Sequence, residues 1–253
     1  MSAIFYNTQP ITSIDEAYSS YKANQFASPF RSTIALLSWL KHEERALQEV
    51  LEQCGIREAS KHIEHHVKPS EGKAQPSQTD LMVIDASSSA ALAIEAKWTE
   101  KPDDTVSKWR NKGDNPANKE IVLNWWIKQL QKHANTTLSV DRVNNVVYQM
   151  LHRAASACAI SDKPSMAYLI FHDDHSPKNP QIRDNLRHFW HTLGGPQSFP
   201  FYHIKIDIKP TPRYAPLMYL SKNNNGTIEA ILEALRSEDK LFCFSKPHID
   251  IIR

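Results

Sequence analysis

The chain has 253 residues, 41% of them hydrophobic and 23% charged, which is enough apolar sequence for a real core and excludes a disordered chain. Its formal net charge of +2 neither requires nor excludes a nucleic-acid partner, because a local basic surface is compatible with a near-neutral total. Three widely spaced cysteines argue against a disulfide framework. Without a secretory signal or an apolar run of about 18 residues, we expect a cytoplasmic protein with no membrane association.

The first third of the chain predicts an arm, a helix and three strands. Residues 1–30 are polar and mixed, which is typical of an N-terminal arm. Leucines then recur three and four positions apart between Ser32 or Thr33, either of which can cap a helix, and Gly55, which can end one. Strands are expected at 61–69, 80–86 and 91–98, and the short "SSSA" between the last two predicts an antiparallel hairpin.

In the rest of the chain, predicted helices alternate with predicted strands. A polar stretch at 99–118 precedes two predicted helices, near 119–133 and 143–160. The apolar run "MAYLIFHD" at 166–173 is typical of a strand buried on both faces. Further helices are expected near 180–193 and 227–236, and further strands at 201–209, 217–221 and 241–245. This order predicts an α/β domain around a mixed sheet.

Two charged residues interrupt the otherwise apolar strand at 91–98. Side chains two positions apart share one face of a strand, so Glu95 and Lys97 point to the same side, over which small alanines leave open space. Asp80 begins the partner strand of the hairpin, where its carboxylate is expected to meet that of Glu95. Buried charges are expensive unless they are paired or bind a metal. Two hard oxygen ligands beside an ammonium group suit Mg²⁺.

Asp80 followed by "EAK" at 95–97 resembles the signature of the PD-(D/E)xK nuclease superfamily, although Thr79 stands where the pattern has proline. The resemblance implies that Asp80 and Glu95 bind Mg²⁺, for which Mn²⁺ is expected to substitute. It also implies that Lys97 assists the attacking water or neutralises the transition state. These three residues are therefore the candidate catalytic group.

The same resemblance implies the fold. It predicts a restriction-endonuclease-like core, with a mixed central sheet flanked by helices in the order helix, three-stranded meander, helix, strand. After the arm at 1–30, residues 31–253 would form one domain. Its catalytic core would span about 32–172, followed by a C-terminal elaboration at 173–253.

Features that recur in the PD-(D/E)xK superfamily imply further site residues. Many members carry a glutamate on the first helix that reaches the metal. Of Glu43 and Glu44, Glu44 lies slightly closer to the centre of the leucine stripe, so it is the expected accessory ligand, with an ordinary surface charge as the alternative. On the helix near 143–160, Gln149 and Arg153 are four residues apart and share a face that could contact a phosphate.

Other patterns compete with this assignment. The triplet "DIK" at 207–209 also lies in an alternating strand, but no hairpin brings a second acid to it. His62, Glu64 and His66 share a strand face that could bind a transition metal, although a strand triplet is a poor tetrahedral cage. The loop at 98–119 interleaves two tryptophans with basic residues and could clamp a DNA backbone, or it could be an ordinary solvated loop.

The expected activity is that of a metal-dependent endonuclease that hydrolyses phosphodiester bonds of DNA. Double-strand cleavage in restriction or defence is the first choice, and members that cut both strands usually work as dimers, so a homodimer is expected by resemblance. Two alternatives stay open: a repair or recombination nuclease on branched or single-stranded DNA, and a non-catalytic DNA-binding protein with the same fold. With only six glycines and no glycine-rich phosphate loop, no nucleotide cofactor is expected.

Overall fold

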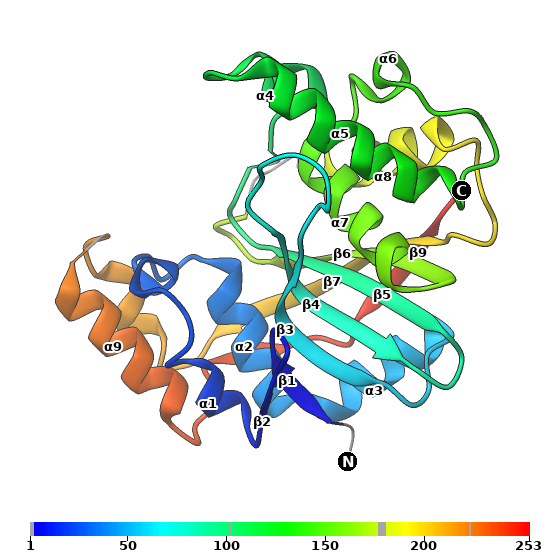
Figure 1. Cartoon of the computed structure of the whole chain (residues 1–253). Helices are drawn as coiled ribbons and strands as arrows, with labels where there is room; N and C mark the ends of the chain where they lie inside the picture. The colour runs from blue at the N-terminus through cyan, green and yellow to red at the C-terminus, as the bar shows by residue number, and fades with distance from the viewer. Residues whose placement is uncertain (1–2, 102, 177–180, 223) are drawn as a thin grey trace.

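A mixed β-sheet forms the centre of the computed structural model, which describes residues 3–101, 103–176, 181–222 and 224–253 (Figure 1). Its strands follow the order β2-β1-β3-β4-β5-β6-β7-β8, and β9 also pairs with β7. The strands are β1 Ile4–Tyr6, β2 Gln9–Ile11, β3 Ser60–Val67, β4 Ser77–Asp85, β5 Ala90–Lys97, β6 Lys163–His172, β7 Phe201–Pro210, β8 Phe242–Phe244 and β9 His248–Ile252.

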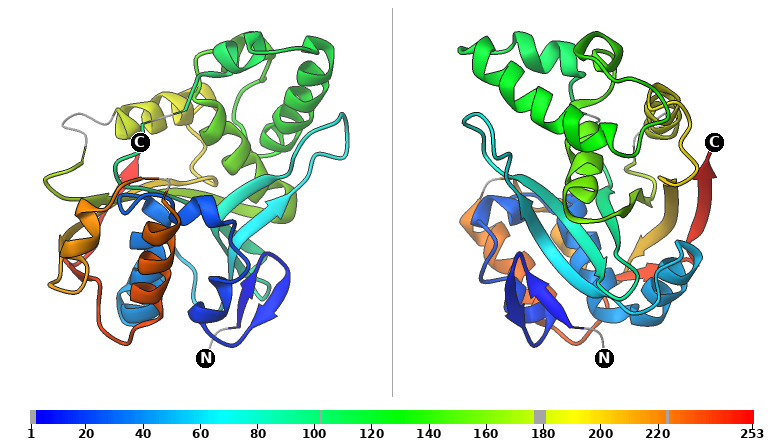
Figure 2. Two further views of the ribbon diagram at one scale, coloured as in Figure 1. Left: turned by 90° about the vertical axis from the view of Figure 1, so that its left-hand side faces the viewer. Right: turned by 45° about the vertical axis from the view of Figure 1, so that its right-hand side comes forward.

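Helices cover both faces of the sheet and make three layers, which both views of Figure 2 show. One layer contains α1 Ile14–Ala17, η1 Ala23–Phe26, α2 Ser32–His42, α3 Glu44–Gln53, η2 Ala215–Tyr219 and α9 Asn225–Arg236. The opposite layer contains α4 Val106–Asn111, α5 Pro116–Gln131, α6 Val140–Val143, α7 Tyr148–Ile160 and α8 Ile182–Thr192. The expected α/β class, with a mixed central sheet flanked by helices, is confirmed.

Strand directions follow from the connections between the strands. β3, β4 and β5 form an antiparallel meander through the links 68–76 and 86–89. In contrast, β5, β6 and β7 run parallel, because helices of the second layer carry the chain back across the sheet. The predicted order of helix, three strands, helices and strand is therefore confirmed. β6 is buried on both faces, as its continuous apolar sequence predicts.

The space expected over the alanines of β5 is filled by α7. Leu92 and Ile94 point into the core beneath α2 and α3, as predicted. On the other face, Ala91 and Ala93 pack with Ala157 of α7 in a small buried cluster. The expectation of open space was wrong, because small side chains on both elements let the helix approach the strand closely.

The N-terminal residues differ from the expected arm. β1 pairs parallel with β3 and antiparallel with β2, so the described residues from Ala3 onward extend the sheet at one edge. Ala17 and Tyr18 are buried in the core beneath α2. Polar composition alone does not reveal this packing, because the buried side chains of the segment are few and widely spaced.

The single helix expected up to Gly55 is divided in two. Glu43 leaves the helical conformation, with φ −126° and ψ 42°, so α2 ends at His42 and α3 begins at Glu44. The Glu43 carboxylate pairs with Lys240, 2.7 Å from its ammonium nitrogen. Leucine spacing predicts the inner faces of both helices but not the break between them.

Smaller differences occur in the second half. The polar stretch at 99–118 contains α4 and the start of α5. The strand expected at 217–221 is wrong, because its first residues belong to the 3₁₀ helix η2 with Pro216 in its first turn. β9, which pairs with β7, was not predicted. α8 begins at Ile182, and residue 180 of its predicted range lies outside the described residues.

The state of the cysteines and the character of the helices can be read directly from the structure. All three cysteines are free, with Cys54 and Cys158 buried and Cys243 exposed. In the part of the chain that the structure describes, no helix combines the length and the apolar character needed to cross a membrane.

Candidate active site

Three acidic residues lie side by side across the antiparallel meander. In the ladder between β4 and β5, Leu81 pairs with Ile94, so Asp80 and Glu95 meet one step beyond that pair. The register between β3 and β4 likewise brings Glu64 opposite Asp80. Directly opposed residues of antiparallel strands have neighbouring side chains. The charges of Glu95 and Glu64 both act on the Asp80 carboxylate, so the three acidic side chains are neighbours here.

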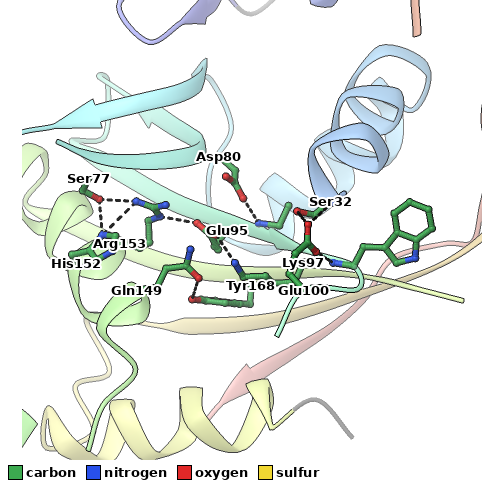
Figure 3. Close-up of polar contacts among 12 residues, drawn as sticks. Ser32, Ser77, Asp80, Glu95, Lys97, Glu100, Gln149, His152, Arg153 and Tyr168 are labelled. Atoms are coloured by element: carbon green, nitrogen blue, oxygen red, sulfur yellow. Dashed lines mark hydrogen bonds and ion pairs between the residues drawn. The ribbon is translucent and has the colours of Figure 1, made fainter. Parts of the chain in front are cut away.

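The strands β4 and β5 separate at this point. Beyond Leu81 the ladder between them stops, while β5 continues beside β6 as far as Lys97. The Asp80 carboxylate occupies the opening, where its Oδ2 accepts a hydrogen bond of 2.7 Å from the backbone N–H of Ala96 (Figure 3). A side-chain acceptor thus satisfies a backbone donor that the separated strand does not reach.

Glu95 is held between two cations. Its Oε1 accepts a hydrogen bond of 2.9 Å from Lys97 Nζ, and its Oε2 accepts one of 2.6 Å from Arg153 Nε (Figure 3). All three side chains are buried, with exposed fractions of 3% for Glu95 and 10% for each cation. Charge-assisted hydrogen bonds of this kind are short and strong in a water-poor setting. Both carboxylate oxygens are therefore engaged.

A short network continues from Arg153 to the start of β4. Arg153 Nη1 donates to Ser77 Oγ at 2.9 Å, and Ser77 Oγ lies 2.8 Å from His152 Nδ1. α7 thereby contacts the first residue of β4 and the middle of β5 through one guanidinium. Its planar fork of donors suits this bridging better than a lysine would.

The acidic groups differ in their protonation. Burial raises the pKa of Asp80 well above its usual value, and the neighbouring charges of Glu95 and Glu64 raise it further. Burial also raises the pKa of Glu64 to about 7, although Arg153 opposes the shift. The pKa of Glu95 is lowered, because Arg153 and Lys97 together outweigh the effect of burial. The site thus holds one secure carboxylate and two that ionise reluctantly.

The ammonium group of Lys97 stays protonated at neutral pH. Burial alone would lower its pKa, but Glu95 and Asp80 outweigh burial and raise it above the ordinary lysine value. A base needs a pKa near the working pH. Lys97 is therefore suited to donating hydrogen bonds and holding positive charge rather than to accepting a proton.

The residues present fit a Mg²⁺ ion by chemical type. Three clustered carboxylates face two cations, and the raised pKa values of Asp80 and Glu64 are the response expected where positive charge falls short. Among the described residues, no group of three or more His, Cys, Asp or Glu side chains forms a ready cage for an ion. Mg²⁺ usually takes one or two protein carboxylates and completes its shell with water and phosphate. Asp80 and Glu95 satisfy that requirement.

Glu44 is not brought to this site. It lies at the start of α3, and its carboxylate is 3.5 Å from Lys61 Nζ. Lys61 pairs with Val83, whose side chain faces the core beneath α2 and α3, opposite to the face that α7 covers. The Glu44 side chain is 72% exposed. Of the two roles considered for Glu44, metal ligand and ordinary surface charge, its surroundings correspond to the second.

The two candidates on α7 have different surroundings. Arg153 does reach the site, but as the partner of Glu95 and Ser77, so its Nε and Nη1 are already engaged in protein contacts. Gln149 Oε1 accepts a hydrogen bond of 3.4 Å from the hydroxyl of Tyr168, which stands beside Glu95 on β6. Both residues lie on the face of α7 that packs toward the sheet.

The competing patterns are used differently. Both ring nitrogens of His62 make hydrogen bonds, to Asn7 O at 2.9 Å and to Ser60 Oγ at 2.8 Å, which gives this histidine a structural role. In "DIK", Asp207 is exposed and pairs with Lys205 Nζ at 3.0 Å. Of the two patterns, only the first supplies a buried carboxylate within the described residues, and that carboxylate, Glu64, lies beside Asp80.

Glu64 lies beside Asp80 and Glu95, although the sequence did not predict it as a residue of this site. It is buried in the middle of β3 with φ +52°, in the left-handed region that favours glycine. Strained backbone of this kind is often found at functional sites. A charged residue within an apolar strand was the available signal, but its position opposite Asp80 required the register of β3 against β4.

The fold and the site together define an α/β protein whose buried charged cluster lies where two strands of a mixed sheet separate. The chain belongs to the family described as Domain of unknown function (DUF6946), whose model matches residues 10–202. The matched residues include the three clustered carboxylates Glu64, Asp80 and Glu95. They also include Lys97 and Arg153. No curated protein and no solved structure matches the chain.

Proposed function

We propose that this protein is a metal-dependent endonuclease that hydrolyses phosphodiester bonds of DNA, with a restriction-endonuclease-like core of the PD-(D/E)xK type. The observation that carries the proposal is the meeting of Asp80 with Glu95 at the separation of β4 and β5, with Lys97 two residues further on. The order helix, meander, helix, strand around β3 to β6 supports the same proposal. Fold alone would not, because function depends on the site.

In this proposal Asp80 and Glu95 hold Mg²⁺, or Mn²⁺ in its place. When bound, the ion would polarise the phosphate and would lower the pKa of a water molecule, so that this water can lose a proton and attack the phosphorus. Lys97 keeps its proton and stabilises the negative charge that develops on the phosphate. Arg153 fixes the orientation of Glu95 through its Nε and is thereby a positioning residue.

DNA is the proposed substrate, with double-strand cleavage in restriction or defence as the first choice and a homodimer as the working form. A protein of this kind would cut each strand with one copy of the site. The alternative nuclease, which acts on branched or single-stranded DNA, would need the same residues in the same roles.

One observation favours a second candidate function. Lys97 and Arg153 occupy both oxygens of Glu95, and a metal ion would compete with them for those oxygens. If these two contacts only stabilise the fold, the site does not cut DNA, and the second candidate is a non-catalytic DNA-binding protein with the same fold. Such a protein would show a thermal shift with DNA and none with Mg²⁺ or Mn²⁺.

Cleavage of plasmid DNA separates these functions. Purified wild-type protein is incubated with supercoiled plasmid and Mn²⁺ or Mg²⁺, beside Lys97→Ala and Glu95→Ala. We expect nicked or linear product from the wild type and a loss of about 100-fold or more in both variants, the usual scale for removing a group that stabilises transition-state charge.

The matched control is Lys163→Ala, which removes an exposed lysine at the start of the neighbouring strand β6. It should cut like the wild type. Circular dichroism shows that each variant is folded. Equal nicking by the wild type, Lys97→Ala and Glu95→Ala would assign the activity to a contaminant and contradict the proposal.

A further inference from the structure

A cavity of about 350 Å³ opens beside the candidate active site. It lies between the segment that leads into β4, the ends of α4 and α5 that face each other, and the first turns of α7. Aromatic rings form one wall, from Trp109, Trp126, Tyr148 and His152. Lys73, Gln75, Asn115 and Lys119 are among the polar residues that also line it.

The aromatic wall is held in place by its own packing. The rings of Trp109 and Tyr148 are stacked, with centroids 3.8 Å apart and planes at 12°. The ring of His152 lies 4.9 Å from Tyr148 and 6.1 Å from Trp126. Trp126 is buried, whereas Trp109 and Tyr148 keep part of their surface accessible. The cavity is therefore a preformed, flat-sided space rather than a gap between mobile side chains.

The charges around the cavity are mainly positive. Lys73 is exposed, whereas Lys119 Nζ lies 5.3 Å from the centre of the Trp109 ring and donates hydrogen bonds to the backbone oxygens of Trp109, at 2.7 Å, and of Lys112. Asp114 is the acidic residue among the lining side chains of the described part of the chain. Aromatic surface with neighbouring lysines is the combination by which proteins bind single nucleic-acid strands, since bases stack and phosphates meet the cations.

The cavity shares two residues with the hydrogen-bond network that holds Glu95. Ser77 and His152 line the cavity, and Ser77 Oγ accepts the hydrogen bond from Arg153, which in turn binds Glu95. Ser77 precedes Asp80 by three residues on the same strand, which corresponds to about 10 Å. That is about the size of one nucleotide, so a strand with its base in the cavity can bring a neighbouring phosphate to Asp80.

We infer that the cavity binds one unpaired nucleobase of the DNA strand whose adjacent phosphate lies at Asp80 and Glu95. The inference rests on the proposed function and narrows its substrate. A paired base cannot enter a space of this shape, so the base that binds is unpaired, and a duplex must first open a base pair, which weakens its binding. Binding of the base is also linked to the orientation of Glu95, because Ser77 belongs to both sites.

Binding in the absence of metal tests this inference without any need for cleavage. Labelled single-stranded DNA is titrated with the protein in EDTA, and its fluorescence anisotropy is measured. An oligomer of equal length with every base removed, a fully paired duplex and deoxynucleoside monophosphates serve as the other ligands. We expect the intact single strand to bind at least about tenfold more tightly than the base-free strand, the duplex or the mononucleotides.

Two variants test whether the single strand binds in the cavity. Ala74→Phe fills the cavity from its half-buried lining, and Trp109→Ala removes part of the aromatic wall. Each should weaken single-strand binding about tenfold or more. Ala86→Phe makes the same change in the exposed turn between β4 and β5, at the other end of β4, and should bind like the wild type. Thermal unfolding checks that all three variants are folded.

Several results would overturn the inference. It fails if Ala74→Phe binds the single strand as tightly as Ala86→Phe does, if the base-free strand binds as tightly as the intact one, or if the duplex does. Equal binding of the mononucleotides would make the cavity a site for a free nucleotide instead.

The two proposals can fail separately. If the wild type cuts plasmid with Mn²⁺ and Ala74→Phe changes neither binding nor cutting, the nuclease stands and the base site does not. If no metal supports cleavage but Ala74→Phe weakens base-dependent binding, the base site stands and the nuclease does not.

Discussion

Two strands of the sheet each carry an acid and a lysine two positions apart, with an apolar residue between them, but in different surroundings. In β5, Glu95 and Lys97 are buried and 2.9 Å apart, and Arg153 binds the second oxygen of Glu95. In β7, Asp207 pairs with Lys205 at a similar 3.0 Å, but these side chains are 59% and 40% exposed. Equal distances therefore accompany very different electrostatic settings.

The difference comes from the neighbouring elements. β5 runs between β4 and β6, and α7 covers the face that bears Glu95, so water is excluded and other acids are close. The Asp207 carboxylate contacts the exposed side chains of Lys205 and His172, and these contacts lower its pKa. Residue identity alone therefore does not make such a triplet a candidate site. Its position in the sheet decides whether it is buried and whether other acids lie beside it.

The largest expected effect concerns stability. Arg153→Met leaves buried Glu95 with one cation instead of two, and breaking a buried ion pair typically costs about 3–5 kcal/mol. Lys205→Met makes the same chemical change at the exposed pair, where the expected cost is below about 1 kcal/mol. Urea unfolding of both variants measures the two costs. Similar losses in both would show that the two settings do not differ energetically.

The next effect is a dependence on pH. Because the pKa of Glu64 is raised to about 7, the folded protein binds a proton that the unfolded chain releases near pH 4.5. The contribution of Glu64 to folding is therefore fully present below about pH 4.5 and is lost as the pH rises toward 7. That loss is on the order of 3 kcal/mol.

The variant Glu64→Gln should isolate this dependence. Its free energy of unfolding should equal that of the wild type near pH 4.5 and exceed it increasingly up to pH 7.5. Comparing the two proteins at each pH cancels the contributions of the histidines. Asp207→Asn, at the exposed pair, should show no such widening difference from the wild type. A constant difference for Glu64→Gln would mean that Glu64 ionises normally in the folded protein.

The sequence alone predicted the strand positions of Asp80, Glu95 and Lys97, because alternation and a short turn determine how a hairpin pairs. It could not identify the cation on the other oxygen of Glu95, since Arg153 is 58 positions away and reaches it only through the packing of α7. The place of Glu64 beside Asp80 could not be predicted either, because it depends on the register between β3 and β4. Glu44 was misplaced because a helical wheel identifies the inner face of a helix but not the face of the sheet that it covers.

The most direct test of the central claim is cation binding at the separation of β4 and β5. The thermal unfolding midpoint is measured with and without Mg²⁺ or Mn²⁺ for the wild type, Asp80→Asn and Asp207→Asn. A ligand present at about 100 times its dissociation constant adds about 2.7 kcal/mol to folding. We expect a higher midpoint with metal for the wild type and Asp207→Asn, and no change for Asp80→Asn. A rise in Asp80→Asn equal to that of the wild type, or no rise in any of the three, would contradict the central claim.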